Sequence, residues 1–110
     1  MAAKQLNFSY NGVDYTLEFT RNTIKQMESN GFIARDFEDK PMSLLPDLFA
    51  GAFLKNHRFT KRALIDEIYG KMHNKPALIE SLTLMYNDTI ESMLFDEPEE
   101  GKNLEWTPNW

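Results

Sequence analysis

The sequence predicts an α+β fold in which an N-terminal β-hairpin packs on about four α-helices, followed by an extended acidic C-terminal tail. Two short N-terminal stretches alternate apolar and polar residues around an Asn-Gly pair, and four later stretches carry apolar residues at helical spacing. The composition then becomes acidic and irregular from residue 96. Because 110 residues suit a single core, we expect one domain over residues 1–95 and a tail over residues 96–110.

The expected hairpin is defined by its turn. Asn11-Gly12 is the strongest two-residue signal for a type I′ turn, which requires positive φ at both positions. Such a turn pairs each apolar residue of the first strand with an apolar residue of the second: Tyr10 with Val13, Phe8 with Tyr15, and Leu6 with Leu17. An isolated hairpin is only marginally stable in water, so we expect helices to cover its apolar face.

The first helix is expected over residues 21–30. Thr20 is a suitable N-cap, because its hydroxyl can accept a hydrogen bond from a free backbone N–H group of the first turn. Gly31 supplies the left-handed residue that commonly ends a helix, and Phe32 can then fold back on Met27.

The second helix is expected to begin after Pro41 and Ser43. Pro46 then falls in the first turn, where proline is tolerated. The apolar residues of this segment predict a buried central helix: Leu45, Leu48, Phe49, Ala52 and Phe53.

Two further helices are expected, the first of them capped by Thr60 and ending near Gly70. The other is the longest, over residues 75–95, and Asn74 with Pro76 opens it. Its apolar residues form a wide stripe at helical spacing: Leu78, Ile79, Leu82, Met85, Tyr86, Ile90, Met93 and Leu94.

The composition excludes several function classes. The chain has no cysteine, no signal-peptide pattern and no apolar run long enough to span a membrane, so a cytoplasmic protein is expected. A net charge of -5 argues against nucleic acid as a partner. Catalytic and phosphate-binding motifs are absent, and His57 and His73 have basic neighbours that would repel a metal ion. We therefore expect a binding protein without enzymatic activity, metal or cofactor.

One basic segment interrupts this acidic chain and contains Lys55, Arg58, Lys61 and Arg62. Lys61 and Arg62 fall at an expected helix start, where the helix dipole disfavours cations. One interpretation is a site for an acidic partner, such as the acidic tail of another subunit. The other is a solvated turn in which Arg62 pairs with Asp66.

The other candidate partner-binding residues are apolar. Trp106 and Trp110 either fold back on the domain or anchor a partner protein, a role for which tryptophan is enriched. The stripe of the last helix is mostly expected to be core. Its methionines, Met85 and Met93, are adaptable side chains that can also serve a chaperone-like surface.

The sequence resembles the tail assembly chaperones of long-tailed phages and prophages of Gram-positive bacteria over nearly its whole length. The sequence segments that carry the resemblance are Tyr15-Thr16-Leu17-Glu18-Phe19-Thr20-Arg21, Gln26-Met27-Glu28 with Gly31-Phe32, Lys40-Pro41, Leu48-Phe49-Ala50-Gly51-Ala52-Phe53 with His57-Arg58, Ile65-Asp66-Glu67-Ile68-Tyr69, Leu82, Met85-Tyr86 and the acidic tail ending in Trp110.

The resemblance implies a protein that binds and solubilises the helical tape measure protein, helps to recruit tail tube protein subunits, and is absent from the finished virion. It also implies a longer product made by ribosomal frameshifting. It implies no particular binding residues, so the candidates above rest on physical arguments. Two alternatives remain open: a small virion structural or connector protein of the head-tail region, and a phage regulatory protein that binds nucleic acid or inhibits a host protein.

Overall fold

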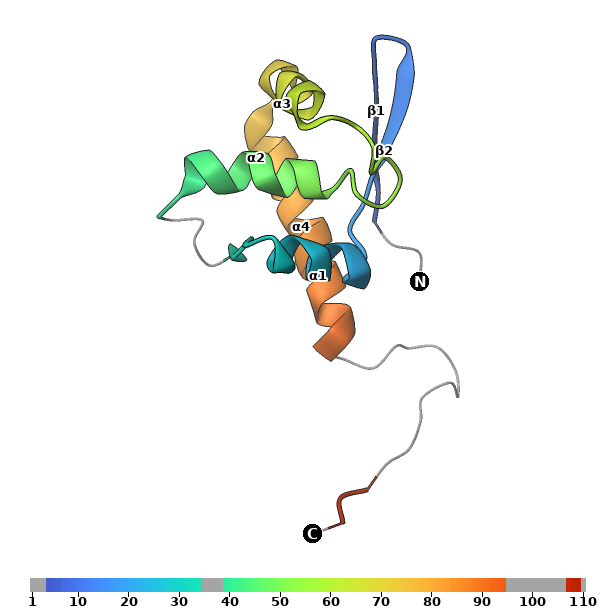
Figure 1. Ribbon diagram of the computed structural model, residues 1–110, viewed down its shortest axis with the longest axis vertical. Helices are drawn as coiled ribbons and strands as arrows, with labels where there is room; N and C mark the ends of the chain where they lie inside the picture. Colours follow the sequence, from blue (N-terminus) through green and yellow to red (C-terminus); the bar gives the residue numbers. More distant parts are fainter. Residues whose placement is uncertain (1–3, 35–38, 95–106, 110) are drawn as a thin grey trace.

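The computed structural model describes residues 4–34, 39–94 and 107–109, with the side chains of residues 93 and 94 excepted. A two-stranded antiparallel sheet is followed by four helices, so the predicted α+β class is confirmed (Figure 1). In chain order the elements are β1 (Leu6–Tyr10), β2 (Val13–Leu17), α1 (Arg21–Ser29), α2 (Pro41–Gly51), α3 (Arg62–Lys71) and α4 (Lys75–Leu94). The predicted acidic tail lies almost entirely outside the described residues.

The hairpin has the predicted register. Leu6 pairs with Leu17, Phe8 with Tyr15, and Tyr10 with Val13. Asn11 (φ 51°) and Gly12 (φ 80°) both have the positive φ that a type I′ turn requires. One face of the hairpin therefore carries all six of these side chains, and the aromatic ring of Phe8 packs on α2 at Phe49, with 6.4 Å between ring centroids.

Helix α1 begins and ends as its flanking residues predict. The Thr20 hydroxyl accepts a hydrogen bond from the Thr23 backbone N–H, and the Thr23 hydroxyl accepts one from the Thr20 backbone N–H. At the other end Gly31 has φ 97°, and the N–H of Phe32 donates to the Met27 carbonyl at 3.0 Å. This is a Schellman ending, which folds the buried Phe32 back over the helix.

Helix α2 is the buried central helix, with Leu48 and Phe49 fully inaccessible to solvent. Its predicted start was wrong, however, because the helix already begins at Pro41. The fixed φ of proline favours the first helical position, and Pro46 consequently lies inside the helix rather than in its first turn. Pro46 cannot donate a hydrogen bond to the carbonyl of Met42, a residue that is 88% exposed.

The predicted Thr60 cap of α3 was also wrong. The Thr60 N–H donates to the His57 carbonyl at 3.0 Å, which makes Thr60 part of the preceding turn. Lys61 is the N-cap instead, and its extended backbone allows its carbonyl to accept the N–H groups of Leu64 and Ile65. No side chain caps this end of the helix.

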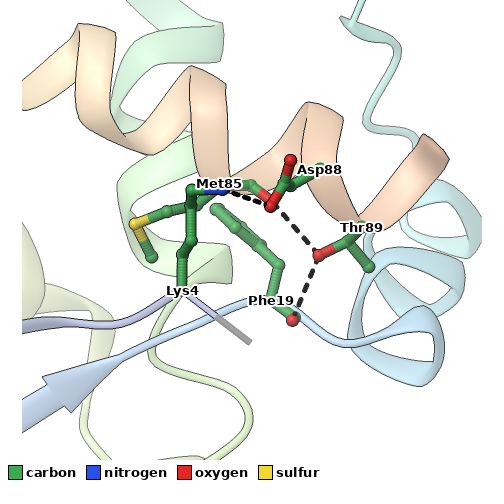
Figure 2. A network of polar contacts seen from close by, with 5 residues as sticks. All are labelled: Lys4, Phe19, Met85, Asp88 and Thr89. Carbon is green, nitrogen blue, oxygen red and sulfur yellow. Dashed lines mark hydrogen bonds and ion pairs between the residues drawn. The ribbon is translucent and has the colours of Figure 1, made fainter. Parts of the chain in front are cut away.

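Helix α4 runs behind α1 and α2 and contacts both (Figure 1). It also holds the end of the hairpin, because the Thr89 hydroxyl lies within hydrogen-bonding distance of the Phe19 carbonyl (3.3 Å) and of the Met85 carbonyl (Figure 2). The Phe19 ring packs edge-on against Tyr86. In the described part of the chain, no helix is both long and apolar enough to cross a membrane.

Candidate functional site

The segment between α2 and α3 forms a loop of successive turns. Beyond Gly51 the N–H of Phe53 donates to the Ala50 carbonyl, and the N–H of His57 donates to the Phe53 carbonyl at 2.7 Å. Ala52 and Phe53 are buried, so the loop is anchored in the core at its first residues. The residues that follow are therefore presented at the surface from a fixed base.

The same loop is bonded to the outer edge of β2. The Thr16 N–H donates to Nε2 of His57 at 3.0 Å, and the Asn56 amide donates to the Thr16 carbonyl at 3.1 Å. One residue beyond the strand, the N–H of Glu18 donates to the Ala52 carbonyl. These three hydrogen bonds join the loop to the β2 edge of the hairpin.

A buried carboxylate reinforces this junction. Glu18 is only 8% exposed, and its Oε1 accepts hydrogen bonds from the amides of Gln5 (3.0 Å) and Asn56 (2.9 Å). Charge-assisted hydrogen bonds of this kind offset the loss of hydration. Asn56 thus ties the loop to both the backbone and a side chain of the hairpin.

The outer surface of the loop is a basic depression, which we define by three cations, Lys55, Arg58 and Lys61, together with Phe59. None of the three cations has an ion pair or hydrogen-bonding partner among the residues that the structure describes. Phe59 is 92% exposed, the largest exposure of any large apolar side chain in the described residues. An accessible aromatic ring therefore stands among three unpaired positive charges.

Arg62 is separated from this depression by its ion pairs. Its guanidinium contacts Asp66 through Nε at 2.9 Å and Asp47 through Nη2 at 2.7 Å. The hydrogen bond to Asp66 is the main reason that the pKa of Arg62 is raised. The predicted pair with Asp66 is present, and the additional pair with Asp47 links α3 to α2. Arg62 is thus part of the scaffold behind the depression.

The remaining candidate residues lie elsewhere. Met85 is 5% exposed and belongs to the hydrophobic core. Trp106, Trp110 and the side chain of Met93 lie outside the described residues. In residues 4–34, 39–94 and 107–109, no group of three His, Cys, Asp or Glu side chains could hold a metal ion.

A second hollow lies under the same loop. It has a volume of about 290 Å³ and is bordered by α1, α2 and α3, with Met27, Phe32 and Ile65 among its lining residues. Asp47 and Arg62, which form an ion pair at 2.7 Å, also line it.

The comparisons with known proteins give one match. The family described as a domain of unknown function, DUF5055, matches residues 1–110. The chain belongs to the DUF5055 family. No curated protein and no solved structure matches it. Because the match spans the whole chain, the hairpin and the basic depression are both parts of the DUF5055 domain.

In this DUF5055 domain, sequence reasoning missed Phe59 and the bonds of Asn56 and His57. No apolar residue lies within three positions of Phe59 in the sequence, because Asn56-His57-Arg58 precede it and Thr60-Lys61-Arg62 follow it. That isolation was the available signal for an exposed aromatic residue. The bonds to β2 join residues 40 or more positions apart, and no local pattern reveals them.

Proposed function

We propose that this DUF5055 chain is a non-catalytic protein-binding module that acts as a phage tail assembly chaperone. It binds the tape measure protein in the host cytoplasm, keeps it soluble, and helps to recruit tail tube subunits. The resemblance of its sequence to that chaperone family supports the biological role. The observation that carries protein binding is the basic depression, in which Phe59 is 92% exposed among Lys55, Arg58 and Lys61.

The physical chemistry of the depression fits a protein partner. Burying a phenylalanine side chain contributes about 1.5–3 kcal/mol, so a partner that buries the exposed Phe59 gains this free energy on binding. Aromatic residues surrounded by charged groups are typical of protein-binding surfaces. The long stems of lysine and arginine can cover apolar surface while their charges meet carboxylates. A helical partner with apolar residues flanked by acidic ones satisfies both requirements.

The test is co-expression of the chain with the tape measure protein of the same genome. We expect the wild-type chain to keep its partner soluble and to co-purify with it. Phe59→Ala is expected to weaken binding by about tenfold or more, because it removes the apolar contact. Arg58→Glu/Lys61→Glu is expected to weaken it further, and binding should then no longer weaken as salt is added.

Two matched control variants separate this surface from general effects. Met42→Ala removes another exposed apolar side chain (88% exposed), and Lys25→Glu reverses an exposed charge on α1. Both are expected to bind as the wild type does. The proposal fails if no complex forms with the wild-type chain, or if the control variants lose binding as much as Phe59→Ala.

The alternative roles give different results. A virion structural or connector protein would be abundant in purified particles by mass spectrometry, whereas a chaperone is absent from them. A nucleic-acid-binding regulator would retard DNA or RNA in a mobility shift at low salt, and that affinity would fall steeply with added salt. We expect neither result. For nucleic acid, the reason is that the net charge of -5 opposes phosphate binding outside the depression.

A further inference from the structure

The two edges of the hairpin differ in how they are covered. The outer edge of β2 is bonded at Thr16 by the loop that follows α2. On the outer edge of β1, the N–H and C=O groups of Asn7 and Ser9 point away from β2, because Leu6, Phe8 and Tyr10 are the residues hydrogen-bonded across the hairpin. Asn7 and Ser9 are exposed, and their backbone groups have no partner within the described ranges.

The apolar side chains show the same asymmetry. On β2, Tyr15 and Leu17 are buried, at 6% and 0% exposure. Their partners on β1, Phe8 and Leu6, are only half-buried, although they lie on the same face of the sheet. The side of β1 away from β2 has no neighbouring strand. The hairpin as a whole stands at one side of the molecule (Figure 1). A further strand beside β1 would cover these side chains and bond to the four free backbone groups.

We infer that β1 pairs antiparallel with β1 of a second copy of this chain, across a two-fold axis at Phe8. In this register Asn7 exchanges both backbone hydrogen bonds with the partner's Ser9, and Ser9 does so with the partner's Asn7. Phe8 then faces the partner's Phe8. The result is a continuous four-stranded sheet in the order β2-β1-β1-β2.

The composition of β1 favours its own copy as the occupant. The strand has no proline, no charged residue and no bulge, the features by which exposed edges usually avoid pairing. An incoming strand must supply apolar residues at every second position and uncharged residues between them, and β1 has this pattern. Its symmetry about Phe8 brings no like charges together across the axis.

A depression beside the start of β1 is placed to receive the partner strand. Leu6 of β1 and Leu84 of α4 border it, and Leu84 is 58% exposed. The ion pair between Lys4 and Asp88, at 2.6 Å, holds the preceding chain against α4 (Figure 2). In the antiparallel register the partner's Tyr10 lies opposite Leu6, beside this depression.

The test compares two double variants by sedimentation velocity over a concentration series of the full chain. The wild type is expected to reach twice the 12.9 kDa of the single chain. Asn7→Lys/Ser9→Lys places like charges opposite each other at both positions and is expected to raise the dissociation constant of the dimer by about tenfold or more. Asn7→Glu/Ser9→Lys changes the same exposed residues but places opposite charges together, so dimerisation is expected to be retained.

The inference is overturned if the wild type is monomeric at all concentrations, or if the two variants dimerise equally. Should either variant fail to fold, amide exchange of the wild type decides the question. The N–H groups of Asn7 and Ser9 are expected to exchange more slowly as protein concentration rises, and unchanged rates would contradict the pairing. The basic depression is not involved, so this test and that of the proposed function can fail separately.

Discussion

At the scale of single residues, Asn56 has the most consequential polar contacts of the loop. One amide group donates to the Thr16 carbonyl and to the buried Glu18 carboxylate. We expect Asn56→Ala to lower the free energy of unfolding by about 1–3 kcal/mol, because a buried charge loses one of its donors. Urea denaturation measures this. The exposed Asn87, changed to alanine, is the control and should lose nothing; an equal loss there would contradict the assignment.

Tyr86 gives the fold a dependence on alkaline pH. Its pKa is raised from the usual value of 10.0, first by burial and then by the charge of Glu28. Below pH 10.0 the phenol is neutral in both the folded and the unfolded chain, so the stability that it contributes is fully present. As pH rises from 10.0 through the raised pKa, the unfolded chain ionises first and this contribution is lost.

We therefore expect Tyr86→Phe to have nearly wild-type stability at pH 8 and a smaller loss of stability than the wild type above pH 10. Denaturant titrations at both pH values measure the difference. Tyr69, whose pKa is also raised by burial, contributes a residual decline in the variant. An identical decline in the wild type and the Tyr86→Phe variant would show that Tyr86 does not contribute.

At the scale of elements, Gly31 and Gly70 differ in whether the backbone conformation of the position requires glycine. Gly31 has φ 97° with open space around it, so Gly31→Ala costs only backbone strain, about 1–2 kcal/mol. Gly70 lies within α3 with ordinary φ and equally open space, so Gly70→Ala should stabilise by about 0.5–1 kcal/mol. Thermal unfolding of both variants checks the opposite signs. Destabilisation by both would indicate contacts that the structure does not show.

The elements differ in how far local sequence determines them. The hairpin register followed from Asn11-Gly12 and the apolar alternation, because both signals lie within a dozen residues. The end of α1 followed from Gly31 for the same reason. The starts of α2 and α3 were misplaced, the N-cap of α3 by one residue, because proline position and turn bonding compete there with side-chain capping. The local sequence was enough to identify Lys55, Arg58 and Lys61 as candidate cations, but it did not single out the exposed Phe59 among them.

At the scale of the whole molecule, charge is distributed unevenly. The net charge is -5, yet Lys55, Arg58 and Lys61 stand without partners in the described part of the chain. Arg62, the fourth cation of the segment, is neutralised by Asp47 and Asp66. The unpaired cations of the basic depression attract an acidic partner as it approaches, so association should slow as ionic strength rises.

The hydrogen bond between His57 and Thr16 also bears on synthesis of the protein. The hairpin leaves the ribosome first, and the residue that covers its β2 edge follows 41 positions later. At roughly 5–20 residues per second, this interval lasts about 2–8 seconds. During that time both edges of the nascent hairpin lack partners, and neighbouring chains on one messenger are close together. Once the loop is made, its bonds to Thr16 cover the β2 edge, and the β1 edge remains open.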